Sequence, residues 1–93
     1  MSDNAILVLI TVPSPETGKN IAEALVTQHL AACVNIVPLI QSLYIWEGKL
    51  CSDQETLLIC KTRAALFEER FLPTVKSLHP YEAVSYTHLR AHE

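Results

Sequence analysis

Apolar positions in the first third of the chain form one continuous run and then one helical stripe. The run Ala5–Val12 is apolar at almost every position, which is typical of a central strand with both faces covered. Ser14 before Pro15 suits a helix N-cap followed by the first helical position. The apolar stripe of this helix consists of Ile21, Ala22, Ala24 and Leu25. We therefore predict a strand over 5–12 and a helix over 15–29.

The next two apolar segments predict an unusually long hairpin. Residues 32–46 form one strand, which we expect to bend at Pro38 because proline cannot donate a ladder hydrogen bond. The turn is predicted at 47–49, around Gly48, and the second strand over 50–62. Within that strand, the polar residues 52–54 indicate either a bulge or a solvated stretch. Two short helices cannot cover so long a hairpin, so we expect other subunits to complete its edges and faces.

A second helix is predicted over 64–78, and a last strand over 81–86. The apolar side of this helix consists of Leu66, Phe67, Phe71, Val75 and Leu78. Pro73 lies inside this helix, where proline costs about 3 kcal/mol, so we expect a break or bend at Phe71 and Leu72. The resulting order β-α-β-β-α-β predicts an α+β protein of the ferredoxin-like plan, an antiparallel sheet with two helices on one face.

Composition narrows the classes of function. The chain has 93 residues, which indicates a single domain (1–93), and 49% of them are hydrophobic, a share that favours an oligomer interface. The net charge is −3 and the basic residues are scattered, which disfavours nucleic acid as a partner. No apolar run reaches the roughly 20 residues of a membrane helix, and the N-terminus lacks a basic leader. We therefore expect a cytoplasmic protein whose cysteines Cys33, Cys51 and Cys60 are reduced.

Neither a nucleotide cofactor nor catalysis is expected. Gly18 and Gly48 are the only glycines, which excludes glycine-rich nucleotide cradles. No set of nucleophile, base and acid is apparent, so we do not expect an enzyme. The opposite hypothesis, catalysis in a cleft between subunits, would require an activity that is lost when Lys61 or His79 is replaced.

Five segments resemble the CutA family of divalent-cation tolerance proteins over residues 5–83. They are LITVP (9–13), LAACVNIVP (30–38), SLYIWEGK (42–49), LICKT (58–62) and HPYE (79–82). The resemblance implies a ferredoxin-like fold and a tight homotrimer in which the long hairpin of one subunit extends the sheet of the next. It also implies a role in tolerance of copper and other divalent cations, with architecture similar to the nitrogen-regulatory signalling trimers.

The chain departs from the family pattern in two places. The family's proposed copper ligands are a cysteine and two adjacent histidines, and the matching positions here are Ile10, Leu78 and His79. Only His79 keeps a ligand side chain. The segment 84–93 does not continue the family's usual strand and last helix, and we expect it to be an atypical, non-native tail. His88 and His92 lie in that segment and carry little weight as a metal pair.

Two sets of residues are candidates for the site. For a copper or other divalent cation we select His79 and Cys33, because imidazole and thiolate are the ligands that such metals favour. The alternatives are, for His79, a helix-capping role or a core hydrogen bond and, for Cys33, a small buried apolar thiol. We expect a cleft between subunits to hold a small ligand, or alternatively to be interface packing. Its residues are Tyr44, Trp46, Gln54, Glu55, Lys61, Tyr81 and Glu82.

Two functional hypotheses follow. The first is a cytoplasmic trimer of divalent-metal homeostasis that binds metal or a small ligand between subunits. The second is a structural or signalling module whose trimeric surface is presented to a protein partner without metal binding.

Overall fold

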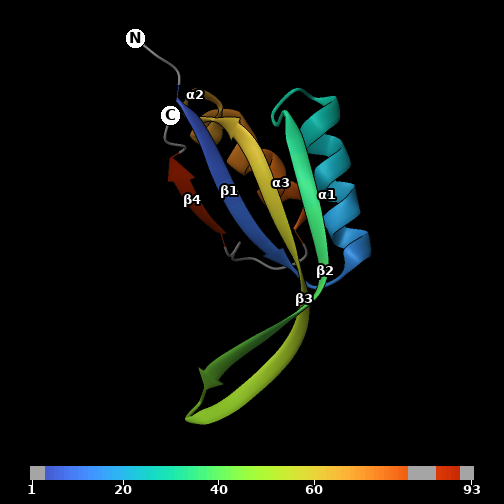
Figure 1. Ribbon diagram of the computed structural model, residues 1–93, viewed down its shortest axis with the longest axis vertical. Helices are drawn as coiled ribbons and strands as arrows, with labels where there is room; N and C mark the ends of the chain where they lie inside the picture. Colours follow the sequence, from blue (N-terminus) through green and yellow to red (C-terminus); the bar gives the residue numbers. More distant parts are fainter. Residues whose placement is uncertain (1–3, 80–85, 91–93) are drawn as a thin grey trace.

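The protein folds as one antiparallel sheet with its helices on one face. The computed structural model describes residues 4–79 and 86–90. The strands β1 (Ala5–Val12), β2 (Cys33–Trp46), β3 (Lys49–Arg63) and β4 (Tyr86–Arg90) lie in the order β2-β3-β1-β4, and every neighbouring pair is antiparallel. Figure 1 shows the helices packed behind the upper part of this sheet, while the end of the β2–β3 hairpin extends away from it.

Alternation along β1 places the core between the sheet and the helices. Ile6, Val8, Ile10 and Val12 are buried, whereas Leu7 and Leu9 on the opposite face are half-buried. The prediction that both faces of this strand are covered is therefore not met within one subunit, because the helices lie on one side only. We call the uncovered side of the sheet the open face.

Helix α1 (Pro15–Thr27) begins as predicted and ends earlier. The Ser14 side chain accepts a hydrogen bond from the backbone N–H of Thr17 at 3.2 Å, and Pro15 occupies the first turn. At the other end, Leu30 N–H donates to Leu25 O at 2.8 Å and His29 N–H to Val26 O at 3.1 Å. These two bonds form a Schellman motif, which stops the helix two residues before the predicted end. His29 occupies its left-handed position with φ 60°.

The hairpin forms as predicted, with a tighter turn. Glu47 and Gly48 have φ of 51° and 76°, and Trp46 pairs with Lys49, so the loop has two residues and Lys49 belongs to β3. Two positive φ values are the mark of a type I′ hairpin turn. The bend expected at Pro38 coincides with a bulge, because the register shifts between Val37 and Ile40. Residues 52–54 pair regularly and are exposed, so they are the solvated alternative.

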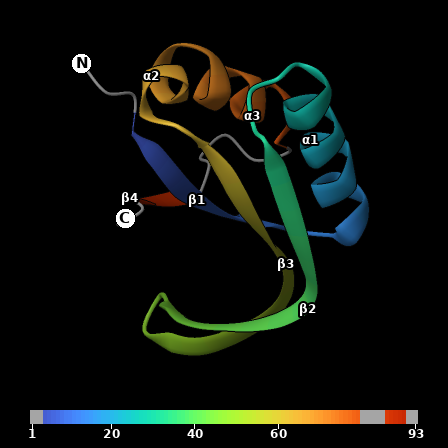
Figure 2. The same cartoon turned by 45° about the horizontal axis from the view of Figure 1, so that its top comes forward.

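The second helical stretch is one continuous run of residues, but its helix type changes along its length. It consists of α2 (Ala64–Leu66), the π-helix η1 (Phe67–Phe71) and α3 (Leu72–Leu78). At Phe71 and Leu72, where a break or bend was predicted, the helical run is not interrupted. The π-helix gives way there to a new α-helical segment, which carries Pro73 in its first turn. Figure 2 shows these segments beside α1 on the same face of the sheet.

The last strand was predicted over 81–86, and residues 81–85 lie outside the described part of the chain. Tyr86 begins β4, which pairs with β1 from Ile10↔Tyr86 to Ile6↔Arg90. Five residues of the segment that we expected to be an atypical tail therefore extend the sheet.

Candidate functional site

The most exposed part of the described chain is the end of the hairpin, which we call the arm and define as residues 40–55. It projects from the body in Figure 1, and the molecule measures 47 × 25 × 22 Å along its principal axes. Four large apolar side chains of the arm are about two-thirds exposed: Leu43, Ile45, Trp46 and Leu50. Monomeric proteins rarely expose contiguous apolar surface of this kind, so the arm is the first candidate for an interface.

The register gives the arm two chemically different faces, because directly opposed residues of an antiparallel pair point to the same side. One side, the aliphatic face, consists of Gln41, Leu43, Ile45, Leu50, Ser52 and Gln54. The other, the aromatic face, consists of Ile40, Ser42, Tyr44, Trp46, Lys49, Cys51, Asp53 and Glu55.

The bulge determines which face each side chain joins. Before it, odd-numbered residues of β2 such as Cys33 pair with odd-numbered residues of β3 on the open face. Pro38 and Leu39 stand opposite Thr56 alone, so β2 has one residue more than β3 at this point. Beyond the bulge, the even-numbered residues of β2 therefore lie on the side of the open face. Tyr44 and Trp46 consequently lie on the continuation of the open face. Leu39 adopts φ 63°, an uncommon conformation for a residue with a Cβ.

A polar contact fixes the tyrosine on the aromatic face. The Tyr44 hydroxyl donates a hydrogen bond to Asp53 Oδ2 at 2.5 Å. This bond to the Asp53 carboxylate, with smaller effects of desolvation and nearby negative charge, raises the pKa of Tyr44 to about 12. The phenol is protonated at neutral pH even with its ordinary pKa of 10.0, and the bond extends this protonated, donating form to higher pH. Sequence reasoning missed Asp53 because only the bulged register brings it diagonal to Tyr44.

The predicted cleft residues fall into three groups within one subunit. Tyr44, Trp46 and Glu55 share the aromatic face, and Gln54 points to the other side. Lys61 lies in the body, paired with Cys33 and Leu7. Tyr81 and Glu82 lie outside the described residues. A cleft that used all seven would have to combine residues from more than one subunit.

His79 follows the last helix and is buried. Its Nε2 lies 3.1 Å from the carbonyl oxygen of Thr11, and its backbone N–H donates to Val75 O at 2.9 Å. The second bond is the last i→i−4 backbone bond of α3 and does not involve the imidazole. The contact of the ring with Thr11 O matches the other alternative, a core hydrogen bond. Of the two other positions matched to the family's ligands, Ile10 is buried in the core and Leu78 is exposed.

Cys33 begins β2 on the open face, away from His79. It is half-buried, and its Sγ lies 4.0 Å from Asn35 Oδ1. Cys33 stands at the level of Leu7, whereas His79 contacts Thr11, four residues or about 13 Å further along β1. Within the described ranges, no group of three His, Cys, Asp or Glu side chains is arranged to hold a metal ion. A site that used both residues would need ligands from two subunits.

The other thiols differ in environment. Cys60 is completely buried beneath the helices, and burial, with a smaller contribution from nearby Cys33, raises its pKa to about 12. It is thus a core residue. Cys51 is half-buried on the aromatic face, with its Sγ 3.7 Å from Lys49 O.

Comparisons with known proteins place this geometry in one family. The sequence matches the profile of the family described as "CutA1 divalent ion tolerance protein" over residues 6–93. It is 53% identical over 75 residues to "Divalent-cation tolerance protein CutA" of Thermus thermophilus, covering 81% of this chain and 72% of that protein. It is 51% identical over 78 residues to "Protein CutA, chloroplastic" of Arabidopsis thaliana, covering 84% of this chain and 42% of that protein.

Solved structures agree in fold. The Thermus thermophilus divalent cation tolerance protein superposes with a TM-score of 0.89 at 47% identity, covering 96% of this chain and 85% of that one. CutA1 from Oryza sativa superposes with a TM-score of 0.92 at 42% identity, covering 99% and 84%. A structure from Archaeoglobus fulgidus at 37% identity is described as periplasmic. Among the residues described here, no helix has the length and apolar character needed to cross a membrane.

Proposed function

Because this chain belongs to the CutA1 divalent ion tolerance family, we propose that it is a cytoplasmic homotrimer of divalent-metal, chiefly copper, tolerance. In this proposal each subunit is a ferredoxin-like unit whose arm extends the sheet of its neighbour. Metal or a small ligand binds between subunits, and the protein is not an enzyme. The observation that carries the proposal is the exposed arm.

The arm supports assembly because a single subunit cannot bury it. Leu43, Ile45 and Leu50 on the aliphatic face are 65%, 66% and 71% exposed. Covering each would contribute on the order of 1–2 kcal/mol. The half-buried Leu7 and Leu9 add apolar surface on the open face. Packing against neighbouring copies would cover both regions.

The same assembly would create the binding cleft. Tyr44, Trp46 and Glu55 continue the open face onto the arm. A neighbour that receives the arm would bring its own body residues against these side chains. His79 and Cys33 of different subunits are the proposed metal ligands, since one subunit holds them on opposite faces of the sheet. Imidazole and thiolate together favour copper or zinc over magnesium or calcium.

Sedimentation tests the assembly. Wild type should sediment as a trimer at micromolar concentration, and the double variant Leu43→Asp/Ile45→Asp as a single subunit, because charge on the aliphatic face cannot be buried cheaply. Val26→Asp is the matched control, since Val26 is an exposed apolar residue of the body. A folded, monomeric wild-type protein would refute the proposed assembly.

Calorimetric titration with Cu(II) and Zn(II) tests the metal role. Wild type should give saturable heat, and His79→Ala and Cys33→Ser should each lower the affinity. Cys51→Ser is the control thiol. Absence of heat above buffer in wild type, or equal binding by all variants, would remove metal from the proposal.

The alternative is an assembly module for a protein partner. It is favoured by the exposure of both faces of the arm, because a neighbour that covered the aliphatic face would leave Trp46 outward. Tryptophan and tyrosine are enriched at protein interfaces. Two results together would decide for this function: metal titrations that give no heat above buffer, and a purified partner that binds wild type but does not bind Trp46→Ala.

A further inference from the structure

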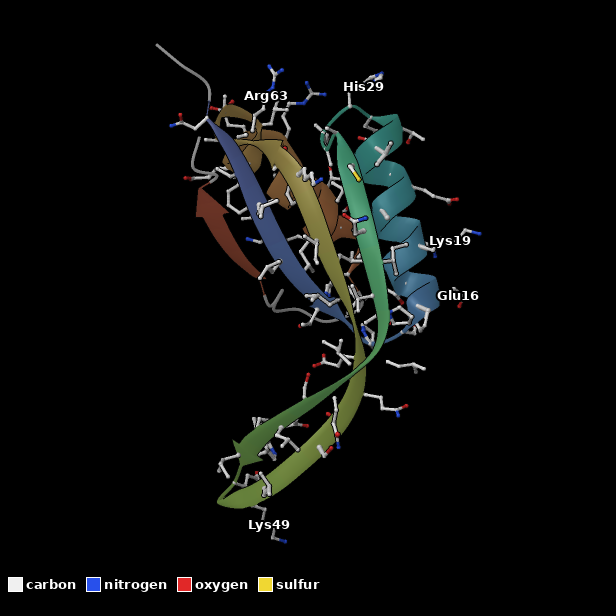
Figure 3. All side chains as sticks on the ribbon, in the orientation of Figure 1. Glu16, Lys19, His29, Lys49 and Arg63 are labelled. Carbon is white, nitrogen blue, oxygen red and sulfur yellow. The ribbon has the colours of Figure 1, made fainter. Side chains whose placement is uncertain are left out.

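A pocket of about 390 Å³ lies at the end of the body farthest from the tip of the arm. Figure 3 shows His29 and Arg63 at that end and Lys49 at the opposite one. The lining comes from the α1–β2 loop, the end of β3 and the first residues of β1 and α2. It comprises Ala5, His29, Leu30, Ala31, Ala32, Lys61, Thr62, Arg63 and Leu66.

The charges of the lining are opposite to those of the whole chain. The protein carries a net charge of −3, yet the described residues that line the pocket include Lys61, Arg63 and His29, and none of these described residues is Asp or Glu. Lys61 and Arg63 are exposed and lie two residues apart on the same face of β3, a spacing of about 7 Å. Two fixed cations beside an imidazole favour an oxyanion, because charge-assisted hydrogen bonds to oxygen are the strongest available to these side chains.

The loop that forms one wall is held rigidly. The N–H groups of Leu30 and Ala31 both donate to Leu25 O, and Ala32 N–H donates to Lys61 O at 2.8 Å. The buried hydroxyl of Thr62 donates to Leu30 O at 2.5 Å. These backbone donors are already used, so recognition has to come from the side chains. A ligand would therefore meet a preformed pocket, which lowers the entropy cost of binding.

The conformation of His29 is a second indication. It holds φ 60° at a helix C-terminus, where glycine or asparagine is normal. Strained residues of this kind concentrate at functional sites, and an observed outlier is grounds for a functional hypothesis. Here the strain places an imidazole at the rim of the basic pocket.

We propose that this pocket binds a small organic oxyanion of the phosphate monoester class. Lys61 and Arg63 hold the phosphate oxygens, His29 donates a further hydrogen bond, and Ala5, Ala31 and Leu66 contact the carbon skeleton. The volume is near the lower end of small-molecule sites, which are roughly 300–1,000 Å³. The site uses no residue of the arm. It shares Lys61 with the expected cleft between subunits, and Lys61 pairs with Cys33, the proposed metal ligand.

Titration of the full chain with glycerol 3-phosphate, inorganic phosphate and succinate tests the proposal. Binding of glycerol 3-phosphate should saturate and be tighter than that of the other two. Lys61→Gln should weaken it about tenfold, as expected for one lost charge-assisted contact. Lys19→Gln on the outer side of α1 removes the same charge elsewhere (Figure 3) and should leave binding unchanged. His29→Asn keeps a residue that tolerates the left-handed conformation and should also weaken binding.

Amide chemical shifts locate the ligand. Residues 29–32 and 61–63 should shift on addition of glycerol 3-phosphate, and the arm should not. Non-saturable binding, equal loss in Lys61→Gln and Lys19→Gln, or shifts confined to the arm would overturn the site. Succinate binding as tightly as glycerol 3-phosphate would overturn the assignment to phosphate monoesters.

Discussion

Replacing His29 by glycine should stabilise the fold, because the native backbone at this position suits a residue without a Cβ. His29 has φ 60° at the left-handed position of the Schellman motif that ends α1. The left-handed conformation costs an ordinary residue roughly 1–2 kcal/mol. Glycine avoids this cost and loses about 0.5–1 kcal/mol through the greater freedom of the unfolded chain. The expected net gain is about 0.5–1 kcal/mol.

Urea unfolding at a fixed protein concentration measures this gain. The midpoint should rise without a change in the slope, since the unfolded surface is the same. Gln28→Gly is the matched control, because Gln28 has φ −89° and gains nothing from glycine. His29→Gly should therefore be the more stable of the two variants. If His29→Gly is no more stable than wild type, the strain argument fails, and with it the second indication for the basic pocket.

Four further predictions concern packing and titration. Gly18→Ala should destabilise by about 1–3 kcal/mol in thermal unfolding, since a Cβ would lie 3.2–3.3 Å from three buried side-chain atoms; a neutral result would show that those atoms yield. Thr56→Val should stabilise by about 1 kcal/mol in the same assay, because Oγ1 of Thr56 is buried without a partner in the described residues. Asp53→Asn should return the pKa of Tyr44 from about 12 toward 10 in an ultraviolet titration. In wild type, the stability that this bond contributes should be fully present below pH 10 and should be lost as pH rises through 12. Trp46 is 65% exposed in one subunit. If the trimer buries its indole, Trp46→Ala should lower the stability of the trimer by about 3–5 kcal/mol. An unchanged thermal midpoint and unchanged sedimentation would show that Trp46 faces solvent.

Local patterns predicted the elements well where the chemistry is local. Ser14 and Pro15 start α1, Gly48 lies in a two-residue turn, and Pro73 lies in the first turn of the α-helical segment that follows the π-helix. Each of these effects depends on a residue's own backbone preference, so the sequence carries the information directly. The helical C-terminus was placed too late because histidine gives no hint of the left-handed position that it occupies.

The site was harder to predict because it depends on register between distant segments. The sequence could not indicate that Asp53 would meet Tyr44, or that Gln54 would leave the face that Tyr44 shares with Glu55. Both follow from the bulge, where Pro38 and Leu39 of β2 stand opposite Thr56 alone. The periodicity of the sequence does not reveal a bulge. The basic pocket was missed for the same reason, since Lys61 and His29 are 32 positions apart and only the fold brings them together.

The bulge at Pro38 and Leu39 also limits how the protruding ribbon can vary in length. Adding one residue to each strand would turn the aliphatic side chains to the side where the aromatic ones now lie, and the reverse. Adding two residues to each strand would keep both sets on their present sides. Viable changes of reach therefore come in increments of about 7 Å. A lone insertion beyond Ile40 would turn the indole of Trp46 to the wrong side, so length variation among functional versions should be even in each strand.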